Sequence, residues 1–263
     1  MDVRLIVVTI CFNNLYELKR TCASVDVQLR PPDEHWIING STTQEIKEWS
    51  VSSEQPIYRR FVNEPDAGIS DAFNKGIRHA GDGWIQLLNS GDELASERVL
   101  ERIHEYLVAR PSLDWISGKI LVERMGRWIE FGCSFERAKL NRGMRRVSHP
   151  SWWVRKSVYD RIGGYDLRYK IAMDYDMLCR ISMESYGYYE FPLVRFDSTG
   201  VSERQFKASL NEVQAIYSEH FGFSLFLYFW QIRLLASRAI IDAIPDVPSR
   251  TKTIFWHKFN LYT

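Results

Sequence analysis

The sequence has little net charge, no paired cysteines and no long apolar run. Its 34 basic and 33 acidic residues nearly cancel, and no basic stripe interleaves with aromatics, so nucleic acid is not an expected partner. The four cysteines are scattered without a Cys-x-x-Cys pair, which argues against a zinc site and a disulfide framework. No apolar run approaches the roughly 20 residues of a membrane-spanning helix. The N-terminal segment lacks the features of a signal peptide, so we expect a cytoplasmic protein.

Two nucleotide-binding motifs are also missing. The dinucleotide fingerprint G-x-G-x-x-G does not follow the first apolar segment, and there is no P-loop. NAD, FAD, ATPase and GTPase chemistry are therefore not expected. The 263 residues suffice for one large α/β domain with an extension.

Short apolar segments alternate with segments of helical spacing. Strands are expected at 5–10, 35–38, 57–62 and 84–88, with helices at 16–25, 43–50 and 69–80 between them. This order predicts a mainly parallel sheet with right-handed crossovers. Beyond it we expect a helix at 97–109, a strand at 114–120, a hairpin and loop over the site at 121–148, a strand at 152–154, helices at 156–162 and 174–185, and helices from 202 to about 244 interrupted near Gly222.

Four of these strands lead into polar turns that carry chemistry. The turns are 9–13, 39–41, 66–68 and 89–92. The carboxyl ends of parallel strands lie at one edge of a sheet, so the four turns are expected to line one ligand cleft. In the last turn Asp92 is placed to hold a hard divalent cation that grips a diphosphate. The alternative is an aspartate in an ordinary turn.

Seven segments, in order, resemble the family 2 glycosyltransferases, which have the GT-A fold. They are Ile6–Asn13, Ile38–Thr42, Glu64–Gly76, Leu87–Asp92, His149–Ser151, Ile162–Asp166 and Ala172–Leu178. The resemblance spans roughly residues 4 to 200. It implies a Rossmann-like, mainly parallel central sheet flanked by helices. It also implies inverting transfer from a nucleotide-diphosphate sugar, usually a UDP-sugar, with Mg²⁺ or Mn²⁺.

The resemblance also implies roles for single residues. Thr9 would meet the base through its backbone, Asn39 would lie beside the uracil, and Asp66 would approach the uridine. Asp92 would bridge the cation and the diphosphate, and Asp174 would be the general base. Further candidates on the nucleotide or substrate side are Asn13, Lys75, Ser90, Gly91, His149 and Asp176.

Chemistry explains why carboxylates are needed at two places. A divalent cation stabilises the charge that grows on the leaving UDP, and inversion requires a carboxylate across the sugar to take the acceptor proton. Asp174 and Asp176 lie two residues apart at a helix start, so they do not share a face. We expect Asp174 to face the cleft while Asp176 caps the helix or forms a salt bridge. The alternative for Asp174 is a carboxylate favoured only by the helix dipole.

Two positions depart from the family pattern. Asn39 stands where the family usually has aspartate; it keeps an acceptor for the uracil N3–H but adds a donor and loses the charge. The metal motif, Asn89 to Asp92, supplies one acid, with Glu93 next to it. We therefore expect uracil recognition to survive, and much of the metal coordination to come from the nucleotide's phosphates.

Several other side chains have both a structural and a functional interpretation. His149 is either a hydrogen-bonded loop residue or a group near metal, phosphate or acceptor. Trp152 and Trp153 face opposite ways, so one is expected in the core while the other stacks on a sugar ring. The basic residues either face solvent or contact phosphate: Lys75 and Arg78 on a helix, and Arg142, Arg145 and Arg146 in a loop that would act as a lid.

We predict a catalytic domain at 1–200 and a helical extension at 201–263. The extension carries an aromatic run with intermittent arginines at 221–238, which suits a membrane interface, a homo-oligomer contact or packing on its own domain. The resemblance implies surface-polysaccharide synthesis, with a hexose or N-acetylhexosamine transferred to a glycan or polyprenyl-diphosphate-linked acceptor at the inner face of the plasma membrane. The alternatives are a sugar-phosphate nucleotidyltransferase, although 11–14 lacks its glycine- and arginine-rich loop, and a non-catalytic nucleotide- or carbohydrate-binding protein.

Overall fold

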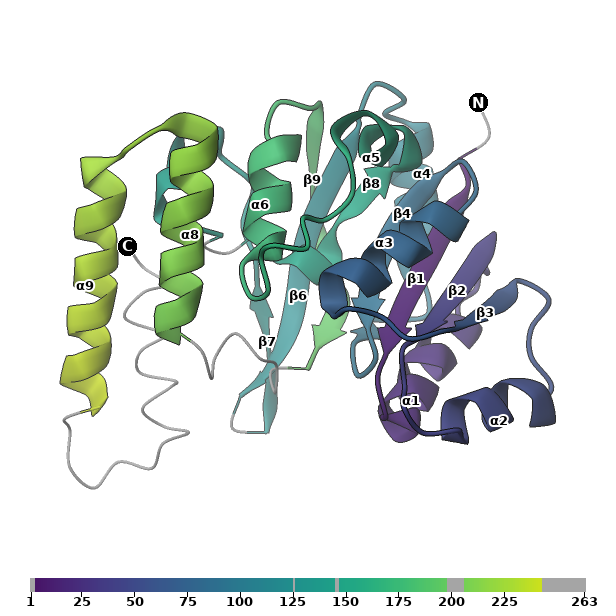
Figure 1. Ribbon diagram of the computed structural model, residues 1–263. Coiled ribbons are helices and arrows are strands. Elements are labelled where there is room, and N and C mark those ends of the chain that lie inside the picture. Colours follow the sequence, from purple (N-terminus) through teal and green to yellow (C-terminus); the bar gives the residue numbers. More distant parts are fainter. Residues whose placement is uncertain (1–2, 125, 145–146, 198–205, 243–263) are drawn as a thin grey trace.

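The computed structural model describes residues 3–124, 126–144, 147–197 and 206–242. Within these ranges nine strands form one sheet, with helices on both of its faces (Figure 1). The order across the sheet is β3-β2-β1-β4-β8-β6-β9-β5, and β7 pairs with β6. The strands are β1 (Leu5–Cys11), β2 (Glu34–Asn39), β3 (Arg59–Asn63), β4 (Trp84–Asn89), β5 (Glu93–Leu94), β6 (Trp115–Arg124), β7 (Arg127–Phe131), β8 (Trp153–Arg155) and β9 (Tyr186–Phe196).

The first four strands are all parallel, as the alternating order predicts. β1 lies between β2 and β4, so that Thr9 is opposite Ile37 on one side and Leu88 on the other. Every residue of β1 is buried, which explains its unbroken β-branched and apolar composition. The carboxyl ends of these strands therefore meet at one edge of the sheet.

The rest of the sheet is mixed. β8 is antiparallel to both β4 and β6, while β9 is parallel to β6. Sequence patterning does not predict β9. Its register against β6 shifts where Pro192 faces Lys119, and this irregularity removes the alternation by which a strand is recognised. The expected helix at 174–185 ends at Ile181, because the chain turns there into β9.

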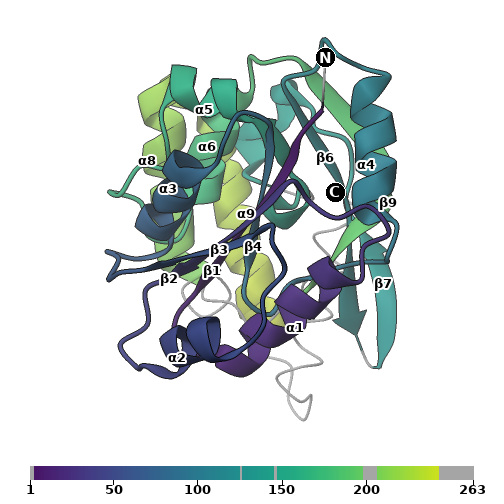
Figure 2. The same ribbon diagram turned by 90° about the vertical axis from the view of Figure 1, so that its right-hand side faces the viewer.

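Helices cover the sheet in two layers (Figure 2). The helices α3 (Ile69–His79), α5 (Lys156–Ile162) and α6 (Met173–Ile181) contribute to the core on one face, and α4 (Val99–Val108) contributes to the core on the other. α1 (Leu15–Asp26) and α2 (Glu45–Ser52) close a third apolar cluster beside β1 and β2. α3 approaches β1 closely at Gly76, where a Cβ atom would lie 2.2 Å from Val8 Cγ1.

Two helices follow the sheet, α8 (Phe206–Phe221) and α9 (Leu225–Asp242). They are separated at Gly222, which has a φ of +81°, so the expected interruption is confirmed. α8 packs against α6, and α9 lies beside α8 (Figure 1). Among the helices described, none is long and apolar enough to cross a membrane.

Candidate active site

The ends of β1, β2 and β4 are joined by backbone hydrogen bonds. Ser90 N donates to Ile10 O at 2.9 Å, and Gly40 N donates to Cys11 O at 3.1 Å. These bonds hold the turns after β2 and β4 against the end of β1. Three of the four expected strand-end turns therefore meet in the structure, and the ligand cleft that they would line stays a prediction.

Asn13 links the first turn to the second. Its backbone has a φ of 53°, a left-handed conformation that asparagine tolerates better than most residues. The side-chain Oδ1 accepts hydrogen bonds from the backbone N–H groups of Thr42 and Thr43 at 3.0 and 3.2 Å. Its own N–H donates to Ser41 Oγ at 2.8 Å. Asn13 thus ties the turn after β1 to the turn after β2 at the protein surface.

Asn39 is buried, and both ends of its amide have partners. Nδ2 donates to Asn63 Oδ1 at 2.8 Å, and Oδ1 accepts from Ser41 N at 3.0 Å. Asparagine supplies the donor of the first bond, which an ionised aspartate lacks. The hydrogen bond to Asn63 is therefore a structural reason for asparagine at this position. The contact of Asn39 with uracil stays a prediction.

Asp66 lies directly against the turn after β2. Its Oδ1 accepts from Gly68 N at 2.9 Å, and its Oδ2 is only 1.7 Å from where a Cβ on Gly40 would stand. The glycine is therefore required for this close approach, and it leaves the carboxylate half-buried beside the end of β2.

Thr9 and Lys75 are both occupied within the protein. Thr9 is completely buried, with its Oγ1 3.0 Å from His35 Nε2. Lys75 Nζ donates to Pro65 O and lies 3.1 Å from Glu64 Oε1. Thr9 therefore lies within the sheet, and Lys75 binds the loop before α3. The contacts of Thr9 with the base and of Lys75 with phosphate stay predictions. Arg78 is exposed on α3.

Asp92 is almost completely buried at the end of β4. Its Oδ1 accepts from Asp197 N at 3.0 Å, while its Oδ2 is buried without a hydrogen-bond partner. Burial raises the pKa of the Asp92 carboxyl to about 7. Gly91, with a φ of +106°, and Ser90 shape the preceding turn; Gly91 N donates to Thr21 Oγ1 at 2.9 Å, and Ser90 Oγ accepts from Asn14 Nδ2.

Asp197 is a second acid at this place that the sequence pattern does not reveal. The antiparallel pairing of β5 with β9 puts Glu93 opposite Arg195, which brings Asp197 beside Asp92. Asp197 Oδ2 lies 3.0 Å from where a Cβ on Gly91 would stand. The residue could be found only by predicting β9 and its partner. The neighbouring acid Glu93 forms an ion pair with Arg20 instead.

Asp174 lies in the first turn of α6, close to a buried histidine. Its Oδ1 is 3.7 Å from His149 Nε2, beyond hydrogen-bond range, and has no hydrogen-bond partner. His149 Nε2 is 2.6 Å from the Tyr165 hydroxyl. Burial raises the pKa of Asp174, although the charge of His149 opposes the rise, and burial lowers the pKa of His149. The Asp174 side chain is 30% exposed, so it is accessible from solvent.

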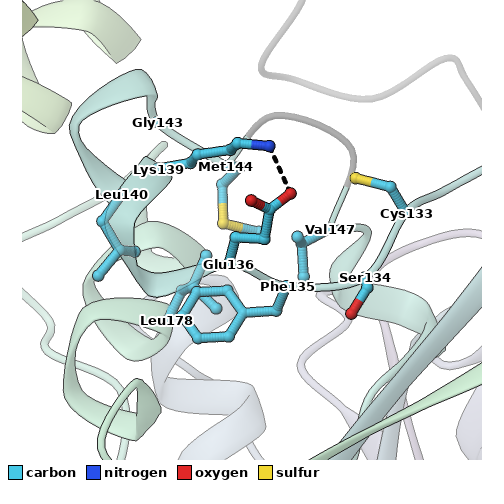
Figure 3. A pocket seen from close by; sticks show the side chains of 10 residues that line it. All are labelled: Cys133, Ser134, Phe135, Glu136, Lys139, Leu140, Gly143, Met144, Val147 and Leu178. Carbon is cyan, nitrogen blue, oxygen red and sulfur yellow. Dashed lines mark hydrogen bonds and ion pairs between the residues drawn. The ribbon is translucent and has the colours of Figure 1, made fainter.

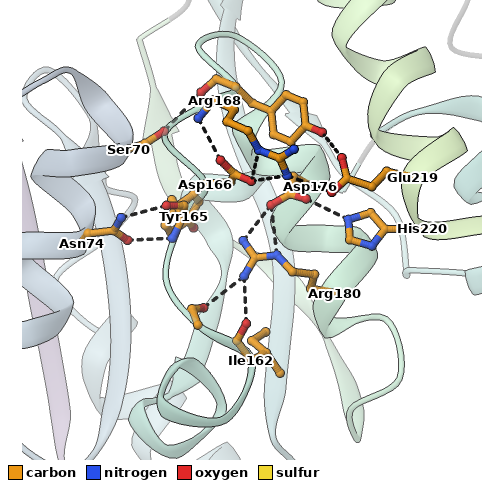
Figure 4. Close-up of polar contacts among 12 residues, drawn as sticks. Ser70, Asn74, Ile162, Tyr165, Asp166, Arg168, Asp176, Arg180, Glu219 and His220 are labelled. Carbon is orange, nitrogen blue, oxygen red and sulfur yellow. Dashed lines mark hydrogen bonds and ion pairs between the residues drawn. The ribbon is translucent and has the colours of Figure 1, made fainter.

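Asp176 is buried in an ion-pair network (Figure 4). Its Oδ2 accepts from Arg180 Nη2 and Nε at 2.7 and 3.0 Å, and its Oδ1 is 2.8 Å from His220 Nε2 of α8. Both oxygens are thus used inside the protein. The expected salt bridge of Asp176 is present, while the substrate-side contacts of Asp176 and the role of Asp174 as base stay predictions.

The segment after β7 forms a short 3₁₀ helix, η1 (Arg137–Arg142), and encloses a small cavity with Leu178 of α6 (Figure 3). The cavity has a volume of about 20 Å³, room for about one water molecule. Arg142 lies 5.4 Å from the ring centres of both Phe226 and Trp230 of α9. Arg145 and Arg146 lie outside the described residues, so the expected lid stays a prediction.

The expectation that one of the two adjacent tryptophans stacks on a sugar is wrong. Trp152 is 2% exposed and Trp153 is 0% exposed. They face opposite ways, as expected, but Trp152 belongs to the core under α3 and α6, and Trp153 belongs to the core under α4. Both faces of the sheet are covered by helices here, so neither ring is available to a ligand.

Three comparisons with known proteins bear on this geometry. The family model described as glycosyl transferase family 2 matches residues 6–163. A Mycobacterium tuberculosis protein named as an uncharacterized glycosyltransferase is 30% identical over 219 residues, which cover 81% of this chain and 83% of the relative. A PGL/p-HBAD biosynthesis glycosyltransferase of Mycobacterium bovis is 24% identical over 165 residues, or 62% of this chain and 60% of that one.

Solved structures show the same fold. Residues 1–349 of Staphylococcus aureus TarS in complex with UDP superpose with a TM-score of 0.59 at 14% identity, over 99% of this chain and 90% of that one. The chain spans 55% of the longer crystallised TarS chain. The mannosyltransferase PcManGT of Pyrobaculum calidifontis, in complex with GDP-Man and Mn²⁺, has a TM-score of 0.58 at 13% identity, over 100% and 81% of the two chains.

The fold is therefore the α/β GT-A fold, with a central sheet flanked by helices. The chain belongs to glycosyltransferase family 2 and is a transferase enzyme. This membership sets aside both alternatives, the nucleotidyltransferase and the non-catalytic binding protein.

Proposed function

We propose that the protein is an inverting glycosyltransferase that transfers a hexose or N-acetylhexosamine from a UDP-sugar to a glycan acceptor. The observation that carries the proposal is a pair of carboxylate oxygens that are buried without a hydrogen-bond partner, Asp92 Oδ2 and Asp174 Oδ1. Buried polar atoms in proteins nearly always have partners. Several buried amide and indole atoms also lack a partner, but among the described residues these two are the carboxylate oxygens that do. Because both acids belong to the family pattern, they favour a site whose remaining partners are the substrates.

Asp174 is the proposed general base. The acceptor hydroxyl oxygen forms a bond to the anomeric carbon, the bond from that carbon to the phosphate oxygen breaks, and the hydroxyl proton passes to Asp174. Three features support the assignment: a carboxylate oxygen without a hydrogen-bond partner, a pKa raised by burial, and a neighbouring acid, Asp176, whose two oxygens are occupied. A base works best with a pKa nearer to the working pH than an ordinary aspartate has. His149, with its pKa lowered by burial, is the proposed neutral neighbour on the substrate side.

Mg²⁺ or Mn²⁺ is the proposed cofactor at Asp92. Among the described residues, no group of three or more histidine, cysteine or acidic side chains is placed to hold a metal. Asp92, with its unpartnered Oδ2, and the adjacent Asp197 fit a cation whose other ligands come from the donor's phosphates. The cation would supply positive charge to the departing diphosphate.

The nucleotide is proposed to lie along the ends of β1, β2 and β4. One structural neighbour binds UDP, and another structure of it is in complex with UDP-GlcNAc, which supports a UDP-sugar. The residues proposed to face the nucleotide or its phosphates lie in β1 and β2, in the loops after β1, β3 and β4, and in α3, namely Thr9, Asn39, Asn13, Asp66, Ser90, Gly91 and Lys75. The other neighbour is in complex with GDP-Man, so GDP-mannose is the donor with which the UDP-sugars should be compared.

The acceptor is proposed to be a glycan or a polyprenyl-diphosphate-linked glycan of surface polysaccharide. The relative named for PGL/p-HBAD biosynthesis supports a glycan or glycolipid pathway. We also propose a catalytic domain at 1–200, an extension at 201–263, and a cytoplasmic location with peripheral contact to the inner face of the membrane. Exposed apolar side chains on α9, such as Phe229 and Ile240, support a membrane or homo-oligomer contact.

The experiment that tests the proposal is a donor screen with product analysis. The purified chain is incubated with Mn²⁺ and with UDP-glucose, UDP-galactose, UDP-GlcNAc, UDP-GalNAc or GDP-mannose, and nucleotide release is measured with and without candidate glycan acceptors. We expect release from one UDP-sugar above the others, and inverted anomeric configuration in the product by NMR. Release from GDP-mannose alone, retained configuration, or no release from any donor would contradict the proposal.

A further inference from the structure

A side chain of a distant helix binds the backbone just before α6. The residue that precedes α6, Ala172, has no side chain that can cap the helix, and no side-chain cap bond forms there. Backbone N–H groups at a helix start need acceptors from outside the helix. The carboxylate of Glu212, on α8 and 40 residues further along the chain, accepts from the N–H group of Ala172.

Glu212 accepts three backbone hydrogen bonds from consecutive residues. One carboxylate oxygen accepts from Lys170 N at 3.1 Å. The other accepts from Ile171 N at 2.9 Å and from Ala172 N at 2.7 Å. Hydrogen bonds to an ionised acceptor are about twice as strong as neutral ones. A single side chain therefore fixes the three residues that lead directly into the first turn of α6.

That first turn carries Asp174, two residues after the last N–H group that Glu212 holds. We propose that Glu212 is a positioning residue, which sets the place of the Asp174 carboxylate through the backbone of 170–172. The inference rests on the proposed role of Asp174 as base. It adds to the active site a residue from α8, which lies outside the residues matched by the family model.

Other contacts hold α8 in place independently of Glu212. Glu219 binds Arg168 Nη2 and the Tyr169 hydroxyl at 2.8 and 2.7 Å, and His220 lies 2.8 Å from Asp176 (Figure 4). These contacts reach side chains, whereas Glu212 alone of these three reaches the backbone before α6. Loss of the Glu212 carboxylate should therefore loosen 170–172 while α8 remains packed.

The test is Glu212→Gln, with Glu219→Gln as the matched control on the same helix. Glutamine keeps one acceptor but turns an NH₂ group toward N–H donors, so the three-bond arrangement cannot form. We expect kcat for UDP release from the preferred sugar nucleotide to fall about 10- to 100-fold, the size expected for a displaced catalytic group. The dissociation constant of UDP, measured by calorimetry, should stay within about twofold. Glu219→Gln should change kcat by less than about threefold, as expected for an exposed ion pair.

Two further measurements separate positioning from general destabilisation. Hydrogen exchange of the backbone amides in 170–174 should speed up in Glu212→Gln while that of α8 stays at the wild-type rate. In the Asp174→Asn background, Glu212→Gln should cause no further loss of kcat, because its effect passes through Asp174.

Unchanged exchange at 170–174, unchanged kcat, or an equal further loss in the Asp174→Asn background would overturn the inference. If Asp174→Asn itself retains full turnover, the proposed role of Asp174 as base has failed, and the inference on Glu212 fails with it. If Asp174→Asn is inactive while Glu212→Gln is normal, only the role of Glu212 has failed.

Discussion

The two halves of the sheet build their parts of the site in different ways. Around β1, β2 and β4, polar residues bind the ends of neighbouring parallel strands or the turns that follow them, as Asn39 and Asn13 do. Around α6, the acids depend on partners far away along the chain, such as His220 and Glu212 of α8. The geometry of the first part of the site depends on local turns of a regular sheet. The geometry of the second part depends on how α8 packs against α6.

Asp174 and Asp176 show the same contrast within one helical turn. Asp176 has both oxygens bound by Arg180 and His220, and its role is to hold α6 and α8 together. Asp174 has an oxygen without a hydrogen-bond partner and a raised pKa. Two acids of identical chemistry therefore differ in their partners, which supports a structural role for Asp176 and the proposed catalytic role for Asp174.

The largest expected effect comes from removing the carboxylate of Asp174. Asp174→Asn should lower kcat by about 10²- to 10⁴-fold, the usual contribution of a general base. Affinity for UDP, measured by calorimetry, should stay within about twofold, because the proposed nucleotide site is at the other half of the sheet. Retained turnover would move the role of base to another residue.

Asp176→Asn is the matched control for that variant. Removing one partner of a buried ion pair should lower the free energy of unfolding by about 3–5 kcal/mol, seen as a lower melting temperature. The protein that remains folded should keep turnover within about tenfold of wild type. A full loss of turnover at normal stability would reverse the two assignments.

The second effect concerns the cation end of the site. Asp92→Asn should abolish most of the Mn²⁺-dependent gain in UDP affinity, a loss of about 10- to 100-fold that corresponds to about 1.4–2.8 kcal/mol. Affinity for UDP without metal should change little. Glu93→Gln, which removes the neighbouring acid paired with Arg20, is the control and should keep the Mn²⁺ effect. Equal behaviour of the two variants would remove Asp92 from the metal site.

The third effect is the dependence of turnover on pH. Burial raises the pKa of Asp174, and the base works only in its deprotonated form. As the pH falls through this raised pKa, kcat should fall about tenfold per pH unit, starting above the pH at which an ordinary aspartate titrates. Measuring kcat of the wild-type protein between pH 4.5 and 8 tests this expected fall. A flat profile down to pH 4.5 would contradict the raised pKa.

The smallest effect is expected at the end of β2. Gly40→Ala places a Cβ 1.7 Å from the present position of Asp66 Oδ2, so the carboxylate must move. An overpacked position of this kind costs about 1–3 kcal/mol, and we expect UDP affinity to fall about three- to tenfold by calorimetry. In the Asp66→Ala background the same substitution should have little further effect. An undiminished loss there would show that Asp66 is not the group displaced.

Sequence patterning predicted the first half of the molecule better than the second. Apolar runs such as Leu5–Cys11 and turn residues such as Asn39 lie close together in the chain, so the four parallel strands and their converging ends could be predicted. β9 could not, because the irregularity at Pro192 breaks its alternation. Because β9 was not predicted, the position of Asp197 beside Asp92 could not be predicted either.

The same limit applies to the contacts of α8 and to the tryptophans. Nothing in the spacing of Glu212 or His220 reveals a partner about 40 residues earlier, since such contacts depend on helix docking. Alternation predicted that Trp152 and Trp153 face opposite ways, but helices that cover both faces of the sheet decide that both are buried.

The ends of β1, β2 and β4, with Asp92, form the proposed site for a uridine diphosphate and a divalent cation. Calorimetric titration of UDP into the wild-type chain, with and without Mn²⁺ and with GDP as the comparison, tests this proposal. We expect one saturable site for UDP that binds more tightly with Mn²⁺ and is preferred over GDP. Absence of UDP binding under both conditions, or a preference for GDP, would contradict it.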